Sequence, residues 1–152
     1  MPDYLEKFEK MRVAGRLAAQ TLDMLTDNIK PGVTTEFIDK LGYEFIRDNG
    51  AYSAPLFYRG FKKSLCTSLN HVVCHGIPSD RILNEGDALN VDVTAIIGGH
   101  YGDTSRMFCI GKTPVKVNNL IDATYESMMR AIKLLKPGLR FGDIGYEIQS
   151  FV

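Results

Sequence analysis

Two aspartates, Asp92 and Asp103, lie on either side of a Gly98-Gly99 pair. Residues 87–97 alternate between apolar and polar side chains, which is typical of a strand with one buried face. A Gly-Gly pair is a signal for a two-residue hairpin turn. If the strands pair symmetrically about this turn, both aspartates share one face, with Cα atoms roughly 7–8 Å apart. Two ionised carboxylates at that separation repel one another, and one or two divalent cations would relieve the repulsion.

The register of this ribbon decides the prediction. With a two-residue turn, Asp92 faces Ser105 and Thr94 faces Asp103, whereas a shift by one residue would put the aspartates on opposite faces. Acidic residues on strands are also common on solvated faces, which is the alternative interpretation. However, the rest of the strand is strongly apolar, and Gly102 would allow something to approach the second carboxylate closely. These features make a metal site on this ribbon a candidate, with a solvated acidic face as the alternative that the pattern alone leaves open.

His75 is a third candidate for chemistry. It belongs to a β-rich run over residues 72–78 that Gly76 and Pro78 end, and the end of a strand is a common place for a functional side chain. Taken alone, a histidine here would more often be hydrogen-bonded near the core. The neighbouring Cys74 is expected to be a small buried side chain.

Helices flank this central region. Apolar residues at steps of three and four predict a helix over residues 5–29, followed by a second helix that Thr34 or Thr35 caps. Residues 51–111 are rich in glycine and β-branched residues, which favours strands. A third helix is predicted over residues 118–135 by the same apolar spacing.

The tripeptide Lys-Pro-Gly stops the first and the third helix, at residues 30–32 and 136–138. When the chain is shifted to superimpose these copies, six flanking apolar positions also coincide. This agreement favours a duplicated half-domain over chance recurrence of a common helix stop. The first copy is followed by a helix and strands, whereas the chain stops at Val152 within the second. We therefore expect about the first half of a larger pseudo-symmetric domain, plus two helices.

Composition excludes several classes of protein. The chain has 152 residues, 45% hydrophobic and 24% charged, an ordinary globular composition with one domain as the default. A formal net charge of zero argues against a general nucleic-acid or anionic-membrane binder. There is no apolar run long enough for a membrane span and no apolar signal core at the N-terminus. Three cysteines without a Cys-x-x-Cys pair fit reduced thiols, so a cytoplasmic location is expected.

Three runs carry a resemblance to the type I methionine aminopeptidases: residues 68–78, residues 86–94 and residues 102–108. The resemblance covers essentially the whole chain. It implies an α+β fold of the pita-bread (creatinase/aminopeptidase) type, which is built from two pseudo-symmetric halves. We therefore expect a single, incomplete pita-bread domain over residues 1–152, with its first half at about 1–112 and the start of the second at about 116–152.

The resemblance also implies an activity and a site. The family are dinuclear metallo-exopeptidases that remove the initiator methionine from nascent polypeptides. Asp92 would bind one divalent ion and Asp103 would bridge two, with Mn, Fe, Co or Zn as the metal. His75 would be the catalytic residue that contacts the substrate near the scissile bond. Three residues would line the pocket for the methionine side chain, with plain core packing as the alternative: Tyr58, Phe61 and Cys66.

The chain departs from the family pattern in one respect. One histidine and two glutamates from the second half complete the family's metal site, and residues 1–152 do not contain those positions. We therefore expect the chain to act as part of a longer enzyme and to be inactive alone. One alternative is a catalytically incomplete fragment, or a peptide- or protein-binding module of the same fold. Another is a metallopeptidase that cleaves X-Pro peptides, against which residues 74–78 argue.

The expected partners are peptides with N-terminal methionine and nascent chains, with no nucleic acid and no membrane. Without a second half, the strand face of Leu89, Val91 and Val93 and the last helix would be only partly covered. Exposed apolar surface of that size invites association. We therefore expect self-association through exposed apolar surface, or a loosely folded chain.

Overall fold

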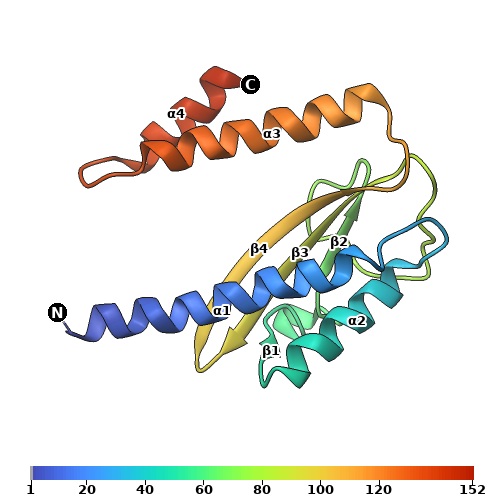
Figure 1. Ribbon diagram of the computed structural model, residues 1–152, viewed down its shortest axis with the longest axis horizontal. Helices are drawn as coiled ribbons and strands as arrows, with labels where there is room; N and C mark the ends of the chain where they lie inside the picture. Colours follow the sequence, from blue (N-terminus) through green and yellow to red (C-terminus); the bar gives the residue numbers. More distant parts are fainter. Residues whose placement is uncertain (1) are drawn as a thin grey trace. The chain divides into compact units, whose positions relative to one another are not determined.

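The computed structural model describes residues 2–152, with side chains from residue 4 onward. The chain divides into two compact units, Met1–Lys112 and Thr113–Val152 (Figure 1). Over residues 2–152, the first unit holds two α-helices and a four-stranded antiparallel sheet, and the second holds two α-helices. None of the helices in this described part has the length and apolar character needed to span a membrane.

The elements of the first unit are α1 (Pro2–Thr26), α2 (Thr35–Asp48), β1 (Tyr52–Ser53), the 3-10 turn η1 (Tyr58–Gly60), β2 (Cys66–Leu69), β3 (Ala88–Ile97) and β4 (His100–Cys109). β3 pairs along its whole length with β4, while β1 and β2 pair with its two ends along the other edge. The predicted ribbon is confirmed, because Ile97 pairs with His100. The predicted cap of α2 is also confirmed: the Thr34 hydroxyl accepts a hydrogen bond from the Phe37 N–H at 3.2 Å.

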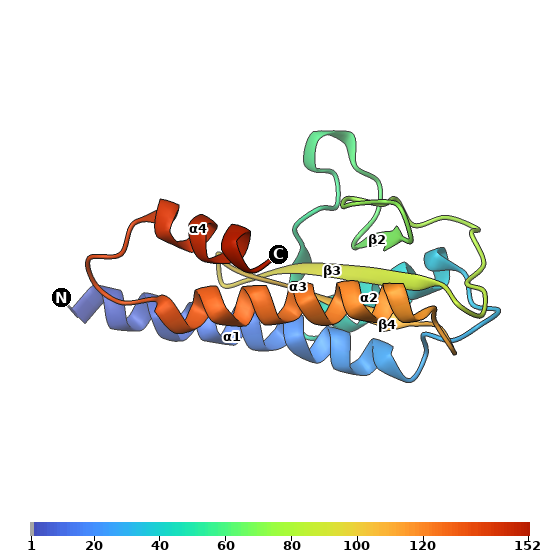
Figure 2. The same cartoon turned by 90° about the horizontal axis from the view of Figure 1, so that it is seen from above.

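The apolar face of β3 is the centre of the core. Leu89, Val91, Val93 and Ala95 have no exposed surface, and α1 and α2 lie on this face of the sheet (Figure 2). The helices contribute Leu17, Ala18, Leu22, Leu25, Ile38 and Ile46 to the same cluster. The expectation that this strand face would be only partly covered is therefore wrong. The helices of the first unit bury it completely, so it offers no surface for self-association.

Residues 72–78 do not form a strand, contrary to the prediction. His75 has a left-handed backbone with φ of 56°, which a continuous strand does not allow. The segment is a loop beside β2, where the Thr67 N–H donates a hydrogen bond to the Gly76 carbonyl at 2.8 Å. Cys74 is exposed on this loop and not buried as expected.

The second unit is a pair of packed helices, α3 (Val115–Leu134) and α4 (Phe141–Phe151). α3 begins before the predicted residue 118, and α4 buries none of its residues. The glycine that follows each Lys-Pro stop has a left-handed backbone, with φ of 89° at Gly32 and 91° at Gly138. α1 ends at Thr26 and α3 at Leu134, so each glycine lies in a turn that follows its helix. The Val33 N–H closes the first turn on the Lys30 carbonyl, and the Leu139 N–H closes the second on the Lys136 carbonyl. The two copies of the repeat therefore form the same local turn.

Gly102 on β4 lets α1 pack directly against the sheet. An added Cβ would lie 2.1 Å from the Ala14 carbonyl carbon and 2.3 Å from the Gly15 nitrogen. The close approach predicted at this glycine is therefore an approach by the backbone of α1. Successive residues of a strand face opposite sides. Because Gly102 faces the helix, its neighbour Asp103 faces away from it.

Replacement of Gly102 with alanine should destabilise the fold by about 3 kcal/mol, because the new methyl group overlaps helix backbone that cannot rotate away. Gly15→Ala is the matched control, because Gly15 lies on α1 where the helix contacts Gly102. Nothing lies within 4 Å of an added Cβ there, and the loss of a helical glycine should stabilise the protein by about 1 kcal/mol. Urea denaturation measures both effects. Wild-type stability in Gly102→Ala would show that α1 and β4 do not pack this closely.

Candidate functional site

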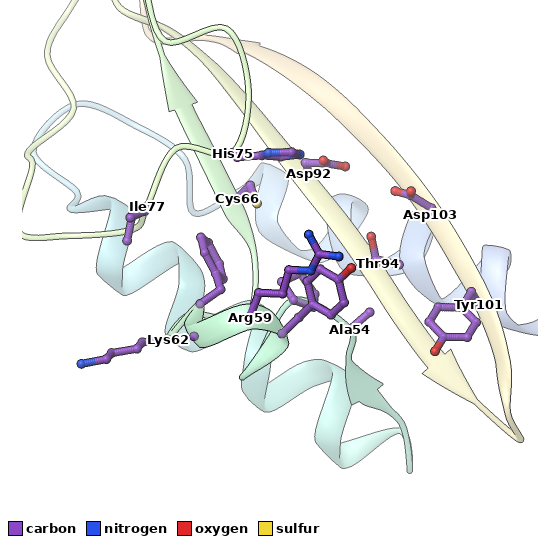
Figure 3. Close-up of a pocket in the computed structure, with 14 residues that line it drawn as sticks. Ala54, Arg59, Lys62, Cys66, His75, Ile77, Asp92, Thr94, Tyr101 and Asp103 are labelled. Carbon is purple, nitrogen blue, oxygen red and sulfur yellow. The ribbon is translucent and has the colours of Figure 1, made fainter.

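A cavity of about 890 Å³ opens on the face of the sheet that carries the polar residues of β3. Four parts of the first unit line it: the segment from β1 through η1, the start of β2, the loop after β2, and the β3–β4 ribbon (Figure 3). Every residue that the sequence predicted for the site lines this cavity: Tyr58, Phe61, Cys66, His75, Asp92 and Asp103. The fold therefore brings all six together in one place.

Asp92 and Asp103 meet inside this cavity. Asp92 pairs with Ser105 and Thr94 pairs with Asp103, as predicted, so both carboxyl groups lie on the cavity face. The two side chains point toward one another across the cavity (Figure 3). Burial raises the pKa of Asp92 above its ordinary value, and the negative charge of Asp103 raises it further, whereas the nearby His75 lowers it. Two like charges held together away from water have this effect.

The carboxylate pair suits a divalent cation. Carboxylate oxygens are ligands that such ions prefer, and a cation between the two groups would replace repulsion with attraction. Over residues 2–152, no group of three or more His, Cys, Asp or Glu side chains is arranged to hold a metal ion. Two aspartates are fewer ligands than one or two such ions take. The pair therefore fits a metal as one part of a larger ligand set.

His75 reaches the cavity from the loop after β2 and lies beside Asp92 (Figure 3). Its left-handed backbone costs about 1–2 kcal/mol for a residue other than glycine. The next residue, Gly76, approaches β2 so closely that an added Cβ would lie 2.2 Å from the Thr67 carbonyl oxygen. The position of the imidazole beside Asp92 therefore depends on how this loop fits against β2.

The apolar side of the cavity comes from η1 and the start of β2, where Tyr58, Phe61 and Cys66 lie. Phe57 and Arg59 hold the turn in left-handed conformations, with φ of 67° and 48°, and the Arg59 guanidinium lies 5.4 Å from the centre of the Tyr58 ring. Burial is the main cause that raises the pKa of Cys66 to about 11. At neutral pH this side chain is therefore a thiol, a soft and weakly polar part of the wall.

Several residues of the cavity wall were not identified from the sequence: Ala54, Pro55, Arg59, Lys62, Ile77, Thr94 and Tyr101. Thr94 could have been found, because the alternation of β3 puts it on the same face as Asp92. The residues between β1 and β2 could not, because the path of that segment follows no local periodicity.

Asp39 of α2 anchors the segment that leads into β2. It is 8% exposed, and its Oδ1 atom accepts hydrogen bonds from the N–H groups of Ser64 at 2.7 Å and Leu65 at 2.8 Å. Burial raises the pKa of Asp39, although these two hydrogen bonds act in the opposite direction. The next residue along the chain is Cys66, so this anchor sets where β2 enters the cavity wall. No pattern in the sequence marks Asp39 for this role.

Known proteins resemble this chain in sequence and in fold. The family described as Metallopeptidase family M24 matches residues 9–152. The chain belongs to metallopeptidase family M24. Its M24 relatives include the methionine aminopeptidase of Rickettsia prowazekii, which is 55% identical over 144 residues, or 95% of this chain and 56% of the relative. The methionine aminopeptidase of Escherichia coli K12 is 48% identical over 97% of this chain and 56% of the relative. The chain thus spans about half the length of the curated relatives it matches.

Solved structures of other proteins have the same fold. The crystal structure of methionine aminopeptidase from Rickettsia prowazekii matches 96% of this chain and 59% of its own length, with a TM-score of 0.95 and 54% identity. The Xaa-Pro dipeptidase of Bacillus anthracis matches 96% of this chain and 40% of its own length, with a TM-score of 0.85. At 19% identity, that second likeness shows the fold alone. The predicted α+β pita-bread fold is confirmed.

Replacement of Asp39 with alanine should destabilise the protein by about 3 kcal/mol, because it leaves two buried N–H groups without an acceptor. Asp39→Asn is the matched control. It keeps the oxygen that accepts both hydrogen bonds and removes the buried charge, so it should cost about 1 kcal/mol or less. Chemical denaturation measures both variants, and equal losses would show that the two hydrogen bonds do not stabilise this segment.

The pH dependence of stability in wild type and in Asp39→Asn provides a second check on the raised pKa of Asp39. Because the pKa of Asp39 is raised in the folded state, its contribution to stability is greatest below the ordinary value of 3.8 and declines as the pH rises through the raised pKa. Asp39→Asn lacks this titration. Its stability relative to wild type should therefore improve between about pH 4 and pH 7, and a constant difference would contradict the raised pKa.

Proposed function

We propose that this chain forms part of a methionine aminopeptidase, an enzyme that removes the initiator methionine from nascent polypeptides. The observation that carries the proposal is the carboxylate pair of Asp92 and Asp103 beside His75, in a cavity that also has an apolar side. The names of the relatives at 55% and 48% identity support the same activity.

In this proposal Asp92 and Asp103 would hold divalent metal, with Mn, Fe, Co or Zn as the candidates. When bound, the metal would polarise the carbonyl of the first peptide bond and lower the pKa of a water molecule. His75 contacts the substrate near that bond and orients it. The free N-terminal amine binds at the same acidic end of the cavity, which limits cleavage to the first residue.

The apolar side of the cavity accepts the methionine side chain in this proposal. Tyr58 and Phe61 supply aromatic surface, and the Cys66 thiol supplies a polarisable contact suited to a thioether. Because the raised pKa keeps Cys66 protonated, it adds no charge that would compete with the carboxylates for a cation. The remaining metal ligands come from the part of the M24 relatives that this chain does not span.

A peptide- or protein-binding role without catalysis is the second candidate, because residues 2–152 supply only part of a metal ligand set. Cleavage of X-Pro peptides has weaker support, since the Xaa-Pro dipeptidase is 19% identical whereas the methionine aminopeptidase is 55% identical. The cytoplasmic location, the nascent-chain partners and the absence of nucleic-acid and membrane partners stay predictions.

The 152-residue chain alone should bind Mn²⁺ or Co²⁺ weakly in calorimetry and release no detectable methionine from the peptide Met-Ala-Ser. The longer enzyme that contains this sequence should release methionine, and a chelator should abolish the release. In that enzyme, Asp103→Asn should lower kcat/KM by about 100-fold or more, because it removes one of the two carboxylates that would hold the metal.

Asp80→Asn is the control for this loss, because Asp80 is exposed in the same unit and does not line the cavity. It should leave kcat/KM unchanged. Preference for X-Pro peptides, or methionine release that survives both chelation and Asp103→Asn, would contradict the proposed function. Peptide binding that needs no metal and leads to no cleavage would favour the binding module.

A further inference from the structure

We propose that Ser68 is a positioning residue for His75 and that it acts through the backbone of Gly76. Its consequence for catalysis rests on the proposed function, whereas its effect on the loop does not. Ser68 lies on β2 and is 3% exposed, so its hydroxyl cannot exchange its partner freely for water. The Oγ atom accepts a hydrogen bond from the Gly76 N–H at 3.1 Å.

Gly76 is held from both sides. Its carbonyl accepts a hydrogen bond from the Thr67 N–H at 2.8 Å, while its N–H donates to Ser68. Among residues 2–152, Ser68 is the one side chain with a hydrogen bond to residues 71–77. At its start the loop is also held by the Val72 N–H, which donates to the Leu69 carbonyl at 3.1 Å. Beside His75, its attachment to β2 depends on one backbone hydrogen bond and one hydroxyl group, both at Gly76.

The conformation of His75 needs this attachment. A left-handed backbone is unfavourable for histidine and persists only where neighbouring contacts determine it. The Gly76 N–H belongs to the peptide bond that follows His75, so the hydrogen bond to Ser68 fixes the orientation of that peptide. Without an acceptor, this peptide is no longer held in one orientation, and the backbone of His75 can relax from its left-handed conformation. The imidazole would then leave its place beside Asp92 (Figure 3).

The neighbouring hydroxyl provides a matched control. Thr67 lies next to Ser68 on β2 and is 4% exposed, but its Oγ1 atom has no hydrogen-bond partner within the described residues. Thr67 pairs with Val91 on the core side of the sheet, whereas Ser68 pairs with Asn90 on the cavity side. Thr67→Val removes a buried hydroxyl of the same strand while leaving the loop attachment intact.

The first test needs no enzymatic activity. Hydrogen exchange of the Gly76 amide and the ring resonances of His75 are measured by NMR in the full chain and its variants. In Ser68→Ala the Gly76 amide should exchange about tenfold faster, and the His75 ring resonances should shift or broaden. The amides of Val91 and Val93 in the core should keep their protection. Thr67→Val should match wild type at both Gly76 and His75.

Two further variants of Ser68 keep the test decisive if the alanine variant does not fold. Ser68→Cys keeps a similar volume but offers only a weak acceptor. It should therefore speed exchange of the Gly76 amide and shift or broaden the His75 ring resonances, as expected for Ser68→Ala. Ser68→Thr keeps the hydroxyl and should restore protection of the Gly76 amide. Wild-type exchange at Gly76 in Ser68→Cys, or equal acceleration in Ser68→Thr and Ser68→Cys, would overturn the proposal.

The second test uses the metal-loaded enzyme and Met-Ala-Ser. Ser68→Ala or Ser68→Cys should lower kcat by about tenfold and leave KM within about twofold of wild type. The reason is that the loop would then misplace the His75 imidazole near the reacting bond. Ser68→Thr should recover most of kcat. If the wild-type enzyme releases no methionine, the proposed function fails while the exchange experiment still decides the role of Ser68. A rise in KM with unchanged kcat would overturn the positioning role.

Discussion

The candidate site depends on one constraint, the register of the β3–β4 ribbon. Gly98 and Gly99 adopt left-handed conformations, with φ of 56° and 76°, and so form the two-residue turn that sets the pairing. The same register buries Val91 and Val93 and turns Asp92 toward the cavity. A slip by one residue would expose the valines and bury the carboxylate. Each valine contributes about 1.5–3 kcal/mol when fully buried, so packing of the core also fixes where the carboxylates lie.

The ribbon could be predicted because its signals are local. Alternation and turn chemistry act between neighbouring residues, and they gave the pairing of Thr94 with Asp103 that the structure has. The loop that carries His75 could not be predicted in the same way. Its β-branched residues favour a strand, but the contact of Gly76 with Thr67 and Ser68 bends the chain into a left-handed conformation. No pattern in the sequence predicts that contact.

The apolar side of the cavity shows the same limit. Tyr58, Phe61 and Cys66 were expected from a family resemblance and not from their spacing. Their place in the cavity depends on the turn around Arg59 and on the anchor between Asp39 and the segment before β2. Both features join parts of the chain that are far apart in sequence. The helices and the ribbon follow from periodicity, and the fold type was implied by the resemblance, whereas the shape of the cavity follows from individual polar contacts between α2, η1 and β2.

The cavity concentrates features that are unfavourable alone. Asp92 has a raised pKa because it is buried beside a like charge, and His75 has a left-handed backbone. Such features persist only where the surrounding structure holds them in place. The opposite face of the sheet provides this support, with Gly102 packed against the backbone of α1. The helix face therefore stabilises the sheet, and the cavity face can retain a repelling carboxylate pair that a bound cation would convert into an attractive interaction.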